Sequence, residues 1–206
     1  MAQGKFITFE GIDGAGKTTQ IEALHRFLLD NGIEVVRTRE PGGTPLGEKI
    51  RAMLLNDDMD VTAETLLFFA ARAQHIRDVI LPAVKRGAWV LSDRFTDATY
   101  AYQAGGKHYS AENVLKLEAI VQQGFGPNKT VLFDLAPETA ARRLALSRTA
   151  DRFETQDRDF FTQVRNAYLA RAEADPERFF VLNAEQAPAV ITQQLLEEAR
   201  RWLDVA

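Results

Sequence analysis

Short apolar runs alternate with longer amphipathic stretches along the chain. The apolar runs have the length and composition of buried strands, and they occupy residues 6–9, 33–36, 89–91, 131–135 and 179–182. Short buried strands that alternate with helices are typical of a parallel sheet with helices on both faces. We therefore predict an α/β fold with three α/β/α layers, in which helices surround a five-stranded parallel sheet.

The amphipathic stretches predict three of these helices in some detail. The first spans residues 18–30, and Asn31-Gly32 ends it. A longer stretch spans residues 62–86, and Pro82 within it predicts a kink or a break. The last helix begins near Pro188 and directs four apolar side chains towards a core: Val190, Ile191, Leu195 and Trp202.

The composition suits a globular protein and argues against several classes of partner. Of the 206 residues, 46% are hydrophobic and 26% are charged, so we expect a single domain over residues 1–206. The net charge of -4 provides no overall positive field for nucleic acid, which we do not expect as a partner. The longest apolar block, residues 66–71, is too short to span a membrane. With no cysteine and no visible secretion signal, we expect a cytoplasmic location.

One segment departs from the alternation of strands and helices. Residues 146–159 are polar, rich in arginine and acidic residues, and lie between two helical patterns. We expect a lid at about residues 147–155.

The strongest motif follows the first predicted strand. The sequence GIDGAGKT matches the phosphate-binding pattern GxxxxGK[ST] in full and leads directly into a helix. In this pattern, glycines turn backbone N–H groups towards phosphate oxygens, the lysine contacts the β and γ phosphates, and the hydroxyl binds Mg²⁺. The alternative, a purely structural glycine-rich turn, does not require the lysine and threonine. The predicted ATP-binding residues are Gly11, Ile12, Asp13, Gly14, Ala15, Gly16, Lys17 and Thr18.

An acidic residue that follows another buried strand is a second candidate metal ligand. Asp93 follows the run at 89–91 after one intervening residue, Ser92, and ligands of open α/β sheets bind beyond the carboxyl ends of the strands. We expect Asp93 to hold or orient the Mg²⁺ shell together with Thr18. The alternative is an ordinary aspartate that caps the next helix.

Both phosphoryl transferases and GTPase switches use such a phosphate loop. The nearest match to the guanine-binding motif NKxD is residues 128–131, which lack the aspartate and precede a strand. Asp93 does not begin a DxxG switch motif either, because the third residue after it is Thr96. The sequence therefore favours a transferase.

An acceptor that is itself a phosphate needs cations to offset the repulsion between two anions. Arg51, Arg72 and Arg94 are candidates, although each alone resembles a solvated surface arginine. Phe68 lies four residues before Arg72 on the same predicted helix, so a ring and a guanidinium share one face. Such a pair can stack on a base and hydrogen-bond to it, while core packing is the alternative for Phe68.

The segments GIDGAGKTT, TREPGGTPLGEKIR, LLFFAARAQH, SDRFTDATYAYQ and SRTADR, in this order, resemble the bacterial thymidylate kinase family over the whole chain. The resemblance implies a P-loop NTPase-type fold and a homodimer. It also implies transfer of the γ-phosphoryl of ATP, with Mg²⁺, to dTMP for dTTP biosynthesis, which gives dTDP and ADP.

Positions that match the family's base and sugar contacts follow from this resemblance. Phe68 would stack on thymine, and Arg72 would donate to an exocyclic oxygen of the base. Thr99 and Gln103 would complete base recognition, and Tyr102 would lie beneath the sugar and disfavour a ribose. A serine that the family often carries nearby is absent, which leaves Thr99 as the hydroxyl supplier.

The resemblance also assigns the acceptor phosphate. Arg51 and Arg94 would clamp the dTMP phosphate, and Asp13 would lie near the sugar 3′-hydroxyl or this clamp. Glu40, from TREPGG, would orient the clamp or a water of the metal.

The phosphate loop carries no basic residue between its first and last glycines, whereas the expected lid carries Arg148 and Arg152. This resembles the bacterial subtype that places a catalytic arginine in the lid, so either residue is a candidate beside Lys17 and Arg94. The acceptor phosphate is already an anion, so the chemistry needs no general base. We therefore expect His25, His75 and His108 to have no required role and to be ordinary helix or surface residues.

Overall fold

The computed structural model describes residues 4–145 and 158–204. Its centre is a sheet of five parallel strands in the order β2-β3-β1-β4-β5, which confirms the predicted sheet. The strands are β1 (Phe6–Glu10), β2 (Val35–Arg39), β3 (Trp89–Asp93), β4 (Lys129–Asp134) and β5 (Phe179–Asn183). The second strand begins later than the predicted 33–36, because β2 is a half-exposed edge strand whose apolar pattern marks its ends weakly.

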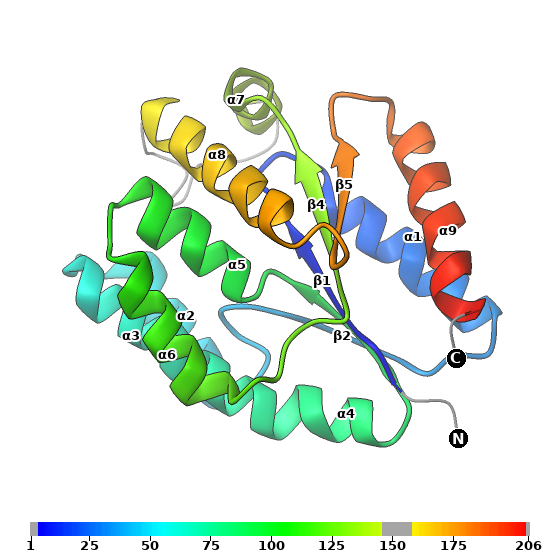
Figure 1. Ribbon diagram of the computed structural model, residues 1–206, viewed down its shortest axis with the longest axis horizontal. Helices are drawn as coiled ribbons and strands as arrows, with labels where there is room; N and C mark the ends of the chain where they lie inside the picture. The colour runs from blue at the N-terminus through cyan, green and yellow to red at the C-terminus, as the bar shows by residue number, and fades with distance from the viewer. Residues whose placement is uncertain (1–3, 146–157, 205–206) are drawn as a thin grey trace.

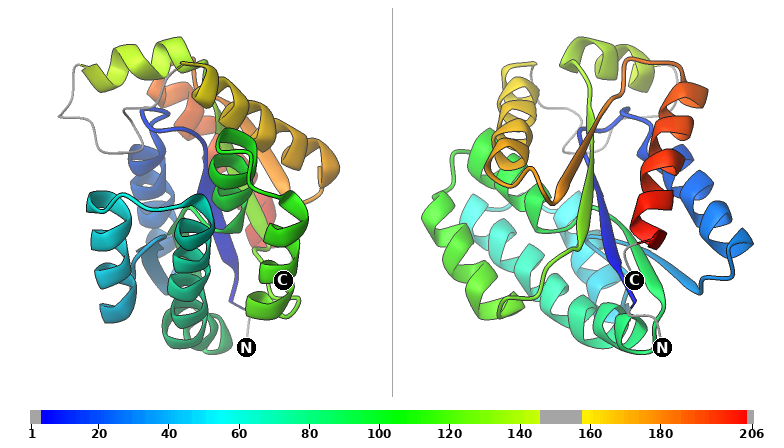
Figure 2. Two further views of the ribbon diagram at one scale, coloured as in Figure 1. Left: turned by 90° about the vertical axis from the view of Figure 1, so that its left-hand side faces the viewer. Right: turned by 45° about the vertical axis from the view of Figure 1, so that its right-hand side comes forward.

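Helices cover both faces of the sheet, as predicted. Helices α1 (Lys17–Asp30) and α9 (Pro188–Asp204) pack together on one face, and most other helices lie on the opposite side (Figures 1 and 2). These others are α2 (Pro45–Asn56), α3 (Val61–His75), α4 (Leu81–Lys85), α5 (Thr96–Thr99), α6 (Ala111–Gln122) and α8 (Arg158–Ala174). Helix α7 (Pro137–Ala145) lies beyond the carboxyl end of β4 (Figure 1).

The long stretch near Pro82, for which the sequence predicts a kink or a break, stays helical but changes its hydrogen-bond pattern, and the change begins before Pro82. Helix α3 ends at His75, a π-helical turn η1 (Ile76–Ile80) follows, and α4 then begins with Pro82 in its first turn. Proline has no N–H to donate to the carbonyl four residues before it, so the regular α-helical pattern is interrupted ahead of Pro82. A second π-helical segment, η2 (Tyr100–Gly106), continues α5.

The last helix begins at Pro188, as predicted, and buries Ile191, Leu195 and Trp202. Val190 is the exception, because its side chain is 42% exposed. Successive helical residues are rotated by about 100°, so the residue before Ile191 faces away from the core. None of the helices in the described part of the chain is both long and apolar enough to span a membrane.

Candidate active site

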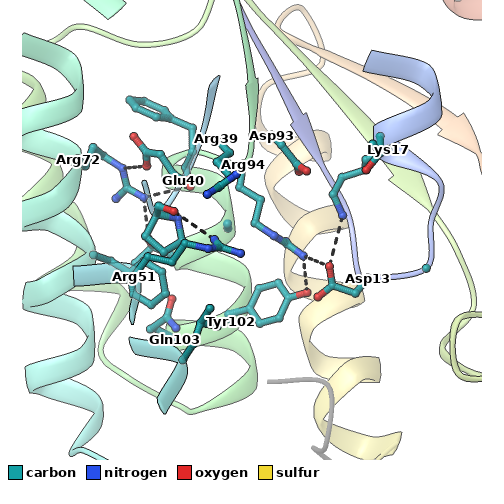
Figure 3. A pocket seen from close by; sticks show the side chains of 18 of the residues that line it. Asp13, Lys17, Arg39, Glu40, Arg51, Arg72, Asp93, Arg94, Tyr102 and Gln103 are labelled. Carbon is teal, nitrogen blue, oxygen red and sulfur yellow. Dashed lines mark hydrogen bonds and ion pairs between the residues drawn. The ribbon is translucent and has the colours of Figure 1, made fainter. Parts of the chain in front are cut away.

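A cavity of about 600 Å³ opens beyond the carboxyl ends of β1, β2 and β3 (Figure 3). It is lined by the phosphate loop after β1, by the segments that follow β2 and β3, and by side chains from α2, α3, η2 and α7. Fourteen of the predicted site residues line it: Asp13, Gly14, Gly16, Lys17, Thr18, Glu40, Arg51, Phe68, Arg72, Asp93, Arg94, Thr99, Tyr102 and Gln103. The predicted lid arginines, Arg148 and Arg152, lie outside the described residues.

The phosphate loop has the backbone conformation that its glycines were expected to allow. Gly11, Gly14 and Gly16 have φ angles of +131°, +81° and +86°, which residues other than glycine rarely adopt. A Cβ atom on Gly11 would also lie 2.6 Å from the carbonyl oxygen of Phe133. The loop therefore requires glycine for its backbone angles and, at Gly11, for space as well.

Lys17 is buried at the start of α1. Its Nζ donates to the carbonyl oxygens of Gly11 and Ile12, at 3.0 and 3.2 Å. Burial lowers the pKa of Lys17, and the positive charge of Arg94 lowers it further. A phosphate ligand would supply the negative charge that favours the protonated lysine.

The donor set at the end of β3 fits a magnesium ion. Oδ1 of Asp93 is buried and has no hydrogen-bond partner within the described residues, and Thr18 lines the same cavity. Mg²⁺ prefers oxygen ligands and is usually held by one or two protein groups together with substrate phosphates. Within residues 4–145 and 158–204, no group of three or more His, Cys, Asp or Glu side chains is placed to hold a metal ion.

Arg94 lies at the centre of a hydrogen-bond network directly after β3. Its backbone has a φ of +70°, and its guanidinium donates to Oδ1 of Asp13 and to the hydroxyls of Tyr102 and Tyr168, at 2.9, 3.0 and 3.0 Å. The Tyr168 hydroxyl in turn donates to Oε2 of Glu10, at 2.8 Å. The sequence indicated Arg94, Asp13 and Tyr102, but it carried no signal for Tyr168, which comes from α8.

A second arginine reaches the same cavity from α2. Nη1 of Arg51 donates to the carbonyl oxygen of Pro41, at 3.1 Å, and its side chain lies near Arg94 and Tyr102 in Figure 3. Two guanidinium groups thus face the cavity from different elements, which suits a bound phosphate.

The opposite side of the cavity carries a rigid arginine beside an aromatic ring. Arg72 is 1% exposed; its Nε donates to Glu40, at 2.8 Å, and its Nη2 donates to the Phe95 carbonyl and the Thr99 hydroxyl. Its Nη1 is buried and finds no acceptor in the described part of the chain. Since Arg72 and half-buried Phe68 line the same cavity, this free donor and the ring can contact one ligand.

The contacts of Glu40 correct the expectation for His75. The imidazole is fully buried, with Nδ1 2.9 Å from Oε1 of Glu40 and Nε2 2.6 Å from the hydroxyl of Thr38. His75 is therefore a buried partner of a cavity residue rather than an ordinary helix or surface histidine. The contacts of Glu40 favour a role in holding Arg72. They favour this role over the two predicted from the sequence, in which Glu40 orients the phosphate clamp or a water of the metal. The spacing of three residues places Arg72 and His75 on one face of α3, but it does not indicate Glu40 as their shared partner.

Gln103 is also held by residues that the sequence did not indicate. Its Nε2 donates to Oε1 of Glu64, at 2.9 Å, and Nζ of Lys107 contacts both carboxylate oxygens of Glu64. Arg143, from α7, is another cavity residue that was missed; its guanidinium donates to the carbonyl oxygens of Gly14 and Ala184.

Comparisons with known proteins identify the family of this chain. The family model described as thymidylate kinase matches residues 9–195. The chain is 51% identical to a thymidylate kinase from Methylobacillus flagellatus, over 97% of this chain and 98% of that protein. It is 54% identical to one from Ralstonia nicotianae, over 93% of this chain and 96% of that protein.

A solved structure extends the similarity to the fold. The crystal structure of thymidylate kinase from Ehrlichia chaffeensis aligns with a TM-score of 0.78 at 31% identity, and the alignment covers 96% of this chain and 99% of that one. The family model, the similar sequences and the solved structure agree, and the chain belongs to the thymidylate kinase family.

Proposed function

We propose that this chain is an ATP-dependent nucleoside monophosphate kinase that transfers the γ-phosphoryl of ATP to dTMP, giving dTDP and ADP. The observation that carries this proposal is a single cavity with two unlike ends. The phosphate loop with Lys17 forms one end, and the ring of Phe68 with the free donor of Arg72 forms the other. Arg51 and Arg94 line the same cavity and supply the positive charge that an acceptor phosphate requires.

At the donor end, residues 11–18 bind the phosphates of ATP. Their backbone N–H groups and the start of α1 attract the anionic oxygens, and Lys17 neutralises charge on the β and γ phosphates. Thr18 and Asp93 hold Mg²⁺, which neutralises negative charge on the phosphates when it is bound. The unpartnered Oδ1 of Asp93 supports this assignment.

At the acceptor end, Phe68 stacks on thymine and Arg72 donates to an exocyclic oxygen of the base. Thr99 and Gln103 complete base recognition, and Tyr102 lies against the sugar. Arg51 and Arg94 bind the dTMP phosphate, and the ion pair with Asp13 supports the position of Arg94.

The reaction needs only correct placement of two charged groups. An oxygen of the dTMP phosphate attacks the γ phosphorus, the bond to the β–γ bridging oxygen breaks, and ADP leaves with the electron pair. The attacking oxygen carries no proton at neutral pH, so no general base is required. Lys17, Arg94 and a lid arginine, Arg148 or Arg152, stabilise the transferring group.

We also propose that the enzyme acts as a homodimer. Helices α2, α3 and α6 are neighbours in Figures 1 and 2. Their exposed large apolar side chains are Leu46, Met53, Leu66, Leu115 and Ile120. A second copy of the chain that covers this face would remove them from water. The cytoplasmic location, the single domain over residues 1–206 and the lid at about 147–155 stay predictions.

The test is an ADP-release assay with ATP, Mg²⁺ and a panel of nucleoside monophosphates. We expect dTMP to be the preferred acceptor, with a reaction lacking acceptor as the control for ATP hydrolysis. Failure of dTMP beside efficient turnover of AMP, GMP or UMP would assign the chain to another kinase of this class.

A further inference from the structure

We propose that Glu64 and Lys107 fix the hydrogen-bond polarity of Gln103, and so make the cavity select a pyrimidine that carries hydrogen on ring nitrogen N3. Both are positioning residues, because they act through Gln103. The inference rests on the proposed function and names what selects its acceptor base.

A buried carboxylate holds the Gln103 amide. Gln103 is 1% exposed in η2, and its Nε2 donates to Oε1 of Glu64, at 2.9 Å. Glu64 is fully buried in α3, and Nζ of Lys107 lies 2.8 and 2.7 Å from its two oxygens. A buried charge is tolerated when it is paired and hydrogen-bonded, and Lys107 provides that pairing here.

The contact with Glu64 decides which end of the amide faces the cavity. An amide has one donor end and one acceptor end of nearly the same shape, so its hydrogen-bond partners determine its orientation. An ionised carboxylate only accepts hydrogen bonds, so the NH₂ end of Gln103 must face Glu64. The amide oxygen is then the end turned away from Glu64, and because Gln103 lines the cavity, this oxygen can accept a hydrogen bond from a ligand that carries an N–H group.

The positions along α3 place this acceptor beside the base-facing side chains. Glu64, Phe68 and Arg72 are spaced by four residues and share one face of the helix. Figure 3 shows Arg72 and Gln103 on the side of the cavity away from Lys17. The cavity therefore offers three features to a base. They are the aromatic ring of Phe68, a donor at Nη1 of Arg72, and an acceptor at Oε1 of Gln103.

A donor and an acceptor together match a base with a carbonyl next to an N–H group. Thymine and uracil have this pattern, with hydrogen on N3 and oxygen on the neighbouring carbons. Cytosine has a bare N3, which would face the amide oxygen of Gln103 and leave two acceptors opposed. Sites built to hydrogen-bond a ligand discriminate strongly against analogues that cannot make the bond, because buried polar groups are left unpaired.

The test compares dTMP with 5-methyl-dCMP, which has the same size and the same methyl group but reversed polarity at N3 and C4. We expect the parent enzyme to prefer dTMP by about 10⁴ in kcat/KM. In Glu64→Gln, residue 64 can present either end of its own amide, so the side-chain amide of Gln103 can flip. We expect the preference for dTMP to fall at least tenfold in this variant, while the KM for ATP stays unchanged.

Glu197→Gln is the matched control, because Glu197 is exposed on α9 across the sheet, and we expect it to keep the parent preference. Lys107→Met is the second variant if Glu64→Gln does not fold. It removes the ammonium that pairs with Glu64. The preference of this variant for dTMP over 5-methyl-dCMP should therefore fall, as it should in Glu64→Gln.

If Glu64 has only a structural role, activity with dTMP and with 5-methyl-dCMP should fall equally. An unchanged preference for dTMP in both Glu64→Gln and Lys107→Met would overturn the inference. A parent enzyme that does not discriminate between the two nucleotides would overturn it as well. If the parent enzyme does not phosphorylate dTMP at all, the proposed function itself fails, and this result differs from either outcome above.

Discussion

Lys17 donates its hydrogen bonds to two carbonyl groups of its own loop, so it is poised to exchange them for phosphate oxygens. Contacts that strengthen as charge develops on the β–γ bridging oxygen accelerate the transfer itself. We therefore expect Lys17→Ala to lower kcat by at least about 10²–10³, the effect of removing one such donor, with little change in thermal unfolding. Single-turnover phosphoryl transfer measures this, with exposed Lys85→Ala as the control. Near-parent transfer by Lys17→Ala would remove the lysine from the mechanism.

Glu10 is the buried carboxyl next to the phosphate loop, and its pKa is raised from 4.5 to about 8. Burial is the largest cause and the negative charge of Asp97 adds to it, whereas Arg94 and the hydrogen bonds from Tyr168 and the Phe95 N–H oppose the shift. A carboxyl with a raised pKa binds its proton more tightly in the folded protein. The free energy of unfolding should therefore fall as pH rises from about 4.5 to about 8, by at most about 1.4 kcal/mol per pH unit.

Glu10→Gln removes this titration, so its free energy of unfolding should depend less on pH over the same range. Urea unfolding of both proteins between pH 5.5 and 8 measures the difference. If the two stability profiles run parallel, Glu10 is not the group responsible.

At the scale of elements, two adjacent side chains of α3 point in different directions, one into the cavity and one into the core. Phe68 lines the cavity, whereas Phe69 is 2% exposed in the core. We expect Phe68→Ala to weaken dTMP binding by roughly 1–3 kcal/mol, the usual value for stacking on a base, and to leave ATP binding nearly unchanged. Phe69→Ala should instead cost about 3–5 kcal/mol of stability. Calorimetric titrations with each nucleotide, together with thermal unfolding, distinguish the two, and equal loss of both nucleotides in Phe68→Ala would indicate a structural role.

The expected lid is the second element with a separate prediction, which rests on the sequence because residues 146–157 lie outside those described. An arginine that contacts the transferring phosphoryl contributes roughly 10³–10⁵ to turnover. Either Arg148→Ala or Arg152→Ala should lose a large part of that factor, while dTMP affinity changes little. The measurements are single-turnover transfer and dTMP titration on both variants and on the double variant. If all three react at the parent rate, the lid-arginine mechanism is wrong.

At the scale of the whole molecule, the apolar face of α2, α3 and α6 bears on assembly. Leu115 and Ile120 are 58% and 69% exposed on α6. If a second copy covers this face, the double substitution Leu115→Lys with Ile120→Lys buries two charges at the contact and should give monomers in analytical ultracentrifugation. Leu29→Lys, on the exposed surface of α1, is the control that should leave the dimer intact. A parent protein that is monomeric at micromolar concentration would contradict the proposed homodimer.

The sequence by itself indicated the alternation of strands and helices, the extent of α1, the start of α9 and the phosphate loop, because each depends on local chemistry. The glycines of the loop meet backbone requirements at their own positions, and Gly32 ends α1 with a φ of +75° for the same reason. Phe68 and Arg72 share a helical face because of their spacing alone. The features that were predicted less well, the start of β2 and the side chain of Val190, lie where partial exposure weakens the apolar pattern.

Only the tertiary structure decided which distant side chains hold the cavity residues in place. Tyr168 meets Arg94 across 74 positions, His75 meets Glu40 across 35, and Glu64 meets Gln103 across 39. These pairs form because packing of the helices against the sheet brings them together, and no local periodicity specifies such contacts. Their energies also depend on burial, which a single sequence does not reveal for polar residues. The motifs thus indicated residues that line the cavity, and the fold determined how their side chains are held.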